Sequence, residues 1–92
     1  MGRSRLQIYY SGRVQGVGFR YTVKQQAAGF EVVGTVRNLA DGRVELVAEG
    51  ERGELEAFCT TIRDAGLARF IQREETAWGE ATGQFRGFDI VG

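Results

Sequence analysis

The stretch LQIYYSGRVQGVGFRYTVKQQAAG, residues 6–29, changes from the residue spacing of a strand to that of a helix. Apolar and polar side chains alternate over residues 6–11, the pattern of a strand with one buried face, and we expect this strand to end at Gly12. Over residues 19–28 the apolar positions take helical spacing, and Gly29 stands where a left-handed C-cap would. The stretch therefore predicts a strand, a glycine-rich loop and a helix that ends at a glycine.

The rest of the chain alternates between strand and helix patterns. The expected elements are a strand over 31–38, a tight turn at Asp41-Gly42, a strand over 44–49, a helix that opens at 50–53 and ends before Gly66, a strand over 68–76 and a short strand over 85–91. The order βαββαβ, with the short strand closing the chain, predicts an α+β fold of the ferredoxin-like kind. Such a sandwich has an antiparallel sheet of about four or five strands with two helices on one face.

Length and composition limit the classes of function. With 92 residues the chain has room for one domain, taken as residues 1–92. Its 42% hydrophobic and 26% charged residues are typical of a soluble globular protein rather than a disordered tail or a membrane span. Twelve basic and twelve acidic residues cancel, so the chain lacks the overall positive field with which most nucleic-acid-binding domains attract phosphates. Any anion site must therefore be local.

Several kinds of chemistry lack the residues they need. With no histidine and one cysteine, the chain cannot assemble the common zinc or iron ligand sets, an internal disulfide or a Ser-His or Cys-His pair. Metal catalysis is therefore disfavoured. Cys59 lies among Leu55, Phe58 and Ile62 on the apolar face of the second expected helix, so we interpret it as a core residue. No apolar run follows residues 1–6, and we expect neither a signal peptide nor a transmembrane helix, and a cytoplasmic location.

The most unusual segment is SGRVQGVGFR, residues 11–20, between the first strand and the first helix. A glycine-rich turn that enters a helix presents unpaired N–H groups and the positive end of the helix dipole, which together favour a phosphate or a carboxylate. Arg20 adds a full charge, and its guanidinium can bind two oxygens of a tetrahedral anion. The segment lacks the Gly-Lys-Ser/Thr of a P-loop and the third glycine of a dinucleotide-binding loop. A structural interpretation, in which the glycines only turn the chain and Arg20 is solvated, stays open.

Asn38 ends the second expected strand, just before a turn. An asparagine in such a place is commonly structural, because its side chain can hydrogen-bond its own turn. In the predicted fold, however, the first and second strands flank the first helix through a crossover connection. This arrangement would bring Asn38 near Arg20, and the two would then form one site.

Two segments resemble the signature sequences of the acylphosphatase family. They are GRVQGVGFR, residues 12–20, and GTVRNLADGRVE, residues 34–45, and the resemblance extends over essentially the whole chain. It implies hydrolysis of the carboxyl-phosphate bond of acyl phosphates, without metal or cofactor, to a carboxylate and inorganic phosphate. Thr35 stands where many members have a bulky aromatic residue, and Ala40 and residues 67–69 lie where prolines are common. These departures concern packing and loop rigidity rather than Arg20 or Asn38.

The same resemblance implies roles for particular residues. Arg20 would bind the phosphate alongside backbone N–H groups of the loop, and the Asn38 amide would hold the attacking water, with no covalent intermediate. The loop residues concerned are Gln15, Gly16, Val17, Gly18 and Phe19. A site without histidine is consistent with phosphoryl transfer, which depends more on positioning and charge stabilisation than on covalent help from the protein.

Two other interpretations of the site remain. A non-catalytic ferredoxin-like domain that binds a phosphate- or carboxylate-bearing metabolite needs the loop and Arg20, but it has no evident use for Asn38. A domain that acts on carbamoyl phosphate within a larger maturation factor is disfavoured, because the chain ends where the domain ends.

The remaining aromatic residues also allow more than one role. Tyr9, Tyr10 and Tyr21 could stack on RNA bases, but strand aromatics in a small domain usually fill the core or cover a sheet face. Trp78, in an expected loop, could cap the core or line the acyl side of the site. We expect a monomer that binds a small acyl phosphate and releases inorganic phosphate, with neither nucleic acid nor a membrane as partner.

Overall fold

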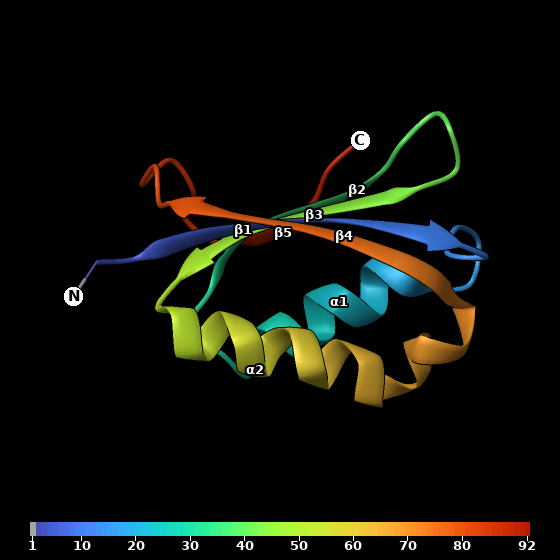
Figure 1. The fold of residues 1–92 in the computed structure, drawn as a ribbon, viewed down its shortest axis with the longest axis horizontal. Coiled ribbons are helices and arrows are strands. Elements are labelled where there is room, and N and C mark those ends of the chain that lie inside the picture. The colour runs from blue at the N-terminus through green and yellow to red at the C-terminus, as the bar shows by residue number, and fades with distance from the viewer. Residues whose placement is uncertain (1) are drawn as a thin grey trace.

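The computed structural model describes residues 2–92, which form one five-stranded sheet and two α-helices. In chain order the elements are β1 (Ser4–Gly12), α1 (Phe19–Ala27), β2 (Val33–Asn38), β3 (Val44–Gly50), α2 (Arg52–Ile62), β4 (Ile71–Glu80) and β5 (Phe88–Ile90). Short helical turns at Arg63–Leu67 and Ala68–Phe70 join α2 to β4. Both α-helices lie on the same face of the sheet (Figure 1). The ferredoxin-like α+β architecture predicted from the sequence is confirmed.

The sheet is mixed, whereas the sequence predicted an antiparallel one. Its strand order is β4-β1-β3-β2-β5, and β1 pairs antiparallel with β3 and β4, as β2 does with β3. At the far edge β5 pairs parallel with β2, where Val36 lies opposite Ile90. The direction follows from the connection, because the chain leaves β4 at one edge, crosses to the opposite edge and starts β5 at the same end at which β2 starts.

The core lies between the sheet and the helices. From the strands it takes alternate residues, such as Leu6, Ile8 and Tyr10 of β1, and from the helices the stripes predicted by their spacing. The helix residues are Phe19, Val23 and Ala27 of α1, and Leu55, Phe58, Cys59 and Ile62 of α2. The rings of Tyr10 and Phe19 contact each other at a centroid distance of 4.9 Å. This contact fixes the start of α1 against the end of β1.

Three local expectations were wrong. Gly29 does not have a left-handed backbone, because α1 ends in right-handed geometry at Ala28 and the Gly29 N–H donates to the Gln26 carbonyl at 3.0 Å. Residues 68–70 form a helical turn, so β4 begins later than predicted and continues to Glu80. Trp78 consequently lies within β4 and not in a loop.

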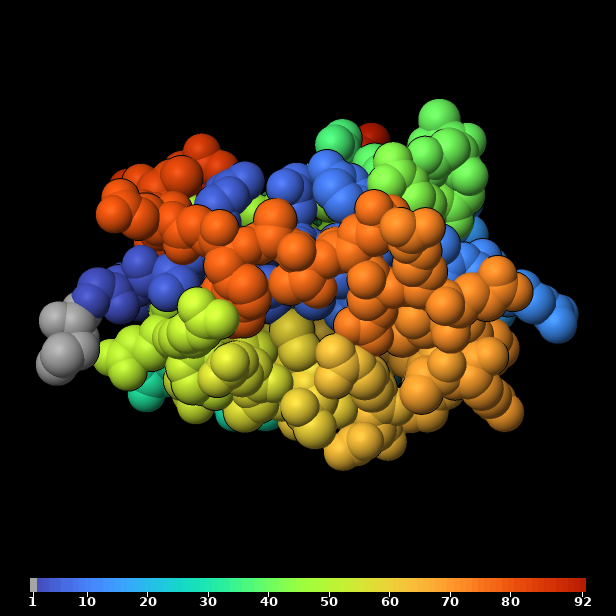
Figure 2. Space-filling model, in the orientation of Figure 1, coloured from blue at the N-terminus to red at the C-terminus, as the bar shows by residue number. Residues whose placement is uncertain are grey.

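The outer edge of the sheet is a charged strand. Most side chains of β4 are exposed, and together with those of α2 they make up much of the face seen in Figure 2. Arg63 pairs with Glu74 at 2.8 Å, and Arg73 lies 3.8 Å from Glu75. Charges on an exposed edge strand discourage pairing with another sheet.

Candidate active site at the carboxyl ends of three strands

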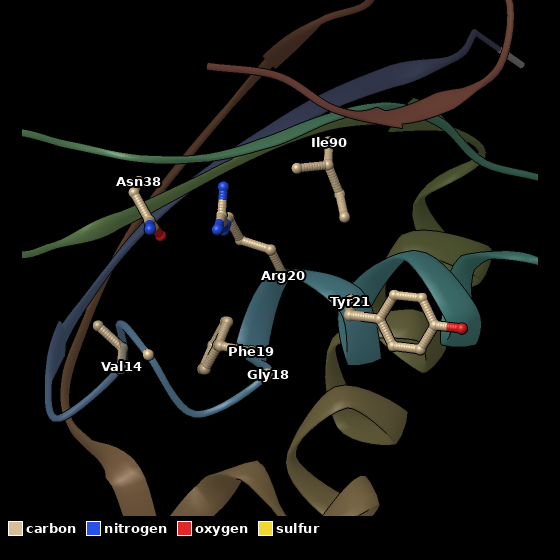
Figure 3. A pocket seen from close by; sticks show the side chains of 8 residues that line it. Val14, Gly18, Phe19, Arg20, Tyr21, Asn38 and Ile90 are labelled. Carbon is tan, nitrogen blue, oxygen red and sulfur yellow. The ribbon is translucent and has the colours of Figure 1, made fainter.

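Strands β1, β2 and β5 run in the same direction, so their carboxyl ends lie at the same end of the sheet, where α1 also begins. A cavity of about 150 Å³ lies there. It is lined by Val14, Gly16, Gly18, Phe19, Arg20, Tyr21, Asn38 and Ile90 (Figure 3). Pockets that hold drug-sized ligands measure about 300 Å³ or more. This cavity therefore suits a small group such as a phosphate with a water molecule.

The glycine loop forms one wall of the cavity. Gly16 and Gly18 have left-handed backbones with φ of 78° and 79°, a conformation that disfavours any residue with a Cβ. Gly18 is the N-cap of α1, and its carbonyl accepts the Thr22 N–H at 3.0 Å. Within residues 2–92, no backbone carbonyl accepts a hydrogen bond from the N–H groups of Gln15 to Tyr21. These donors and the α1 dipole together favour an anion in the cavity.

Arg20 supplies the full positive charge of the site. It lies in the first turn of α1, is half-buried, and extends its guanidinium from the helix toward Asn38 (Figure 3). None of the ion pairs formed among the described residues includes Arg20, whereas Lys24, one turn later, lies 3.9 Å from Asp89. A half-buried guanidinium without a carboxylate partner favours binding of an anion from solution.

Asn38 forms the opposite wall. It is the last residue of β2, and its side chain points toward the space that it shares with Arg20 (Figure 3). Its Oδ1 is buried, and no group of the described residues donates a hydrogen bond to it. An acceptor of this kind costs about 1–3 kcal/mol when it is left without a donor. The structure thus leaves one buried acceptor among the described residues unsatisfied beside the cavity that Asn38 lines.

The turn after Asn38 is closed without the help of its side chain. The Leu39 N–H donates to the Arg43 carbonyl at 2.8 Å, and the Gly42 N–H donates to the Leu39 carbonyl at 3.1 Å. The Asp41 carboxylate accepts hydrogen bonds from the Arg43 backbone N–H at 3.1 Å and from the Arg43 Nε–H at 2.8 Å. These bonds lower the pKa of the Asp41 carboxyl. The Asn38 side chain thus takes no part in the hydrogen bonds that close this turn.

Two of the predicted loop residues do not line the cavity with their side chains. Val17 is 37% exposed, and the Gln15 side chain donates to the carbonyls of Leu39 and Arg43 in the neighbouring turn. The structure adds Val14, Tyr21 and Ile90 to the lining. Val14 and Tyr21 flank the predicted loop in sequence, but Ile90 arrives through the parallel pairing of β5, for which the sequence carried no signal.

Trp78, Tyr9 and Tyr10 do not line the cavity, whereas Tyr21 does. Trp78 stacks under the Arg52 guanidinium, 4.1 Å from the ring centroid, and is not among the residues that line the site. Tyr10 is in the core, whereas Tyr9 lies on the opposite face of the sheet beneath Arg43 at 4.6 Å. Tyr21 lies on α1, with its ring pointing away from Asn38 (Figure 3). The three tyrosines therefore do not form one stacking surface.

The described residues include no group of three or more His, Cys, Asp or Glu side chains placed to hold a metal ion. Among the helices of residues 2–92, none has the length and apolar character needed to cross a membrane.

Comparison with known proteins identifies the family. Residues 6–90 match the sequence model named Acylphosphatase. A curated acylphosphatase of Thermococcus kodakarensis is 42% identical over 90 residues, 98% of this chain and 96% of that protein. The acylphosphatase of Roseiflexus sp. (strain RS-1) is 38% identical over 91 residues, 99% of this chain and 98% of that protein. The crystal structure of acylphosphatase from Bacillus subtilis matches with a TM-score of 0.86 and 33% identity, covering 96% of this chain and 98% of that one. This chain, with its glycine loop, Arg20 and Asn38 around one cavity, belongs to the acylphosphatase family.

Proposed function

We propose that the protein is an acylphosphatase, which hydrolyses the carboxyl-phosphate bond of small acyl phosphates to a carboxylate and inorganic phosphate. The observation that carries the proposal is the buried Asn38 Oδ1, which has no donor among the described residues and faces Arg20 across the cavity. One wall presents positive charge and N–H donors for a phosphoryl group. The other wall presents an acceptor for a water molecule.

In the proposed reaction the phosphoryl oxygens bind the Arg20 guanidinium and the N–H groups of the segment from Gln15 to Phe19. The Asn38 Oδ1 accepts a hydrogen bond from a water molecule and holds its oxygen in line with the carboxyl-phosphate bond. The water oxygen attacks phosphorus, the bond to the acyl oxygen breaks, and its electron pair leaves with the carboxylate. A phosphate oxygen takes the proton of the water.

This reaction requires little general acid-base catalysis by the protein. A carboxylate is a good leaving group because the pKa of a carboxylic acid is only about 4, so no general acid is needed to protonate it. Charge develops on the phosphoryl oxygens and on the departing oxygen, and preorganised donors stabilise it. Loss of one such donor in other enzymes costs about 10²–10³ in kcat, and we expect a similar cost for Arg20.

A non-catalytic anion-binding domain explains less of the site. Such a domain would use the N–H donors and Arg20, but it would gain nothing from a buried amide oxygen held free of its own turn. Such a domain would bind inorganic phosphate but would not hydrolyse an acyl phosphate.

The test is phosphate release from benzoyl phosphate with a chelator present, for the wild type, Arg20→Ala and Asn38→Ala. We expect metal-independent turnover by the wild type, and a loss of about 10²–10⁴ in kcat/KM for each variant with the fold intact by circular dichroism. Arg20→Ala should also weaken competitive inhibition by phosphate, whereas Asn38→Ala should lower kcat with less effect on phosphate binding. A folded wild type that binds phosphate without turnover would support the binding domain instead.

We further infer that residues 1–92 act as one domain, as a cytoplasmic monomer that requires neither nucleic acid nor a membrane. A single core cluster that joins residues from both helices and the sheet supports the one-domain assignment, and equal numbers of basic and acidic residues support the absence of a nucleic-acid partner. Sedimentation velocity with and without added nucleic acid tests the monomeric state and the absence of nucleic-acid binding. Sedimentation as a dimer would contradict the monomer, and faster sedimentation with nucleic acid would contradict the second inference.

A further inference from the structure

The Gln15 side chain bridges the two walls of the cavity. Its Nε2 donates to the Leu39 carbonyl at 2.8 Å and to the Arg43 carbonyl at 3.0 Å. A glutamine side-chain amide has two N–H donors, so both are used. Gln15 directly precedes Gly16 in the cavity lining, and Leu39 directly follows Asn38. The bridge therefore joins the residue before Gly16 to the turn that follows Asn38.

Resting on the proposed function, we propose that Gln15 is a positioning residue that fixes the distance between the phosphate-binding loop and the water-holding amide of Asn38. Its main-chain N–H belongs to the loop, while its side chain acts on the far wall. The side chain does not line the cavity.

Val14 packs the loop into the core, but the hydrogen bonds between the loop and the hairpin that carries Asn38 come from Gln15. The Arg13 N–H donates to the Phe70 carbonyl at 2.9 Å, which ties the start of the loop to the segment before β4. At its other end the loop enters α1 through Gly18. Between residues 13–18 and 38–44, the hydrogen bonds found in residues 2–92 are the two that Gln15 donates.

The loop needs such a bridge because its backbone is permissive. Gly16 and Gly18 lack the side chains that would restrict the chain, and a Cβ added at either position would meet nothing within 4 Å. Arg20 and the N–H donors lie on one continuous segment and keep their relation to each other without the bridge. Asn38 lies on a different element, so its place relative to the bound phosphate depends on the link across the cavity.

Replacement of Gln15 should consequently affect turnover more than phosphate binding. Gln15→Met keeps the length of the side chain but removes both donors. A displacement of about 1 Å between reacting groups can cost about 100-fold in rate, so we expect kcat on benzoyl phosphate to fall by about 10- to 100-fold. The inhibition constant for inorganic phosphate should change by less than about threefold, because the loop itself still binds phosphate.

A double-mutant cycle separates positioning from a general structural effect. If Gln15 acts through Asn38, Gln15→Met should cost little kcat in the Asn38→Ala background, because the amide that it positions is already gone. An equal loss in both backgrounds would overturn the proposal. Asp41→Asn is the matched control, since the Asp41 carboxylate accepts hydrogen bonds from Arg43 in the same turn and none from the loop. It should leave kcat within about twofold of the wild type.

A phosphate titration followed by NMR tests the bridge without turnover. In the wild type, phosphate should shift the backbone amide signals of residues 16–20 and the side-chain amide signals of Asn38. In Gln15→Met the loop signals should still shift, whereas those of Asn38 should shift less. Identical Asn38 shifts in both proteins would overturn the bridge, even if the wild type hydrolyses benzoyl phosphate. Absence of turnover in a wild type with coupled shifts would reject the proposed function and leave the bridge intact.

Discussion

Arg20 combines charge, shape and position in a way that a lysine would not reproduce. Its planar guanidinium can bind two phosphoryl oxygens at once, whereas the ammonium of lysine is a point charge. We therefore expect Arg20→Lys to lower kcat/KM on benzoyl phosphate by about 100-fold, equivalent to about 2.7 kcal/mol. The loss should be smaller than for Arg20→Ala, because the charge remains. Steady-state kinetics of the two variants provides the measurement.

Lys24 provides the matched control for this prediction. It also lies on α1, one turn beyond Arg20, but it is exposed, lies near Asp89 and does not line the cavity. Lys24→Ala removes a positive charge from the same helix and should leave kcat/KM within about twofold of the wild type, since exposed charges are screened by solvent and salt. A large loss in Lys24→Ala would mean that overall charge, and not the Arg20 contact, determines activity.

Gly18 contributes to the site through its backbone conformation. Its φ of 79° is unfavourable for any residue with a Cβ, although a Cβ would meet no atom within 4 Å. Gly18→Ala should lower the free energy of unfolding by about 1–2 kcal/mol and weaken phosphate inhibition. The matched change Gly53→Ala lies inside α2, also meets nothing within 4 Å, and should stabilise the protein by about 0.5–1 kcal/mol. Chemical denaturation distinguishes the two, and equal effects would contradict the backbone argument.

At the scale of elements, residue spacing predicted what depends on local pattern. The switch from period two to helical spacing placed β1 and α1 correctly, and the stripe around Phe58 placed α2. The sequence also predicted that Arg20 and Asn38 lie close together, because a crossover connection brings the carboxyl ends of β1 and β2 to the same end of the sheet.

Features that depend on tertiary context were not predictable. The strand direction of β5 is set by where its connection crosses the sheet, and no residue of Phe88–Ile90 encodes its pairing with β2. Ile90 was therefore missed as a lining residue. The Gln15 side chain was missed for a related reason, because its acceptors are main-chain carbonyls that are 24 and 28 residues away in sequence.

The inward face of α2 makes a prediction about its cysteine. Cys59 is 8% exposed, and burial raises the pKa of its thiol to about 11. A rise of about two units above an ordinary thiol lowers the thiolate fraction at pH 8 about 100-fold. Alkylation by iodoacetamide at pH 8, followed by mass spectrometry, should thus be at least about 100-fold slower in the native protein than in denaturant. Similar rates in both conditions would place Cys59 outside the core.

At the scale of the whole molecule, the two ends of the sheet carry different features. The cavity lies where β1, β2 and β5 end, whereas Glu49 lies near the opposite end, beside Arg5 at the start of β1. The Glu49 side chain is 1% exposed and accepts hydrogen bonds from Arg5 at 3.2 Å, from the Thr82 N–H and hydroxyl at 2.9 and 2.8 Å, and from the Gly83 N–H at 3.0 Å. It thereby joins β1 and β3 to the connection between β4 and β5.

This carboxylate should make stability depend on pH without affecting the site. Burial acts to raise the pKa of Glu49, but the hydrogen bonds from Thr82, Gly83 and Arg5 outweigh it, so the pKa in the folded protein lies below its ordinary value. The unfolded chain then binds a proton more readily than the folded one. The contribution of Glu49 is fully present above the unfolded pKa of about 4.3 and is lost as the pH falls through the lower folded value.

Glu49→Gln should therefore reduce the free energy of unfolding at pH 7 by about 1.5–3 kcal/mol, the range for hydrogen bonds to a charged group. The difference from the wild type should shrink as the pH falls below about 4.3, because the wild type then loses the same charge. Urea unfolding from pH 7 to pH 3 measures both quantities. The exposed residue Glu80 supplies the control, since Glu80→Gln should retain the acid-dependent loss of the wild type. Turnover at pH 7 and 25 °C should be unchanged in Glu49→Gln, because Glu49 and the cavity lie at opposite ends of the sheet. A stability difference that stays constant down to pH 3 would contradict a lowered pKa of Glu49 in the folded protein.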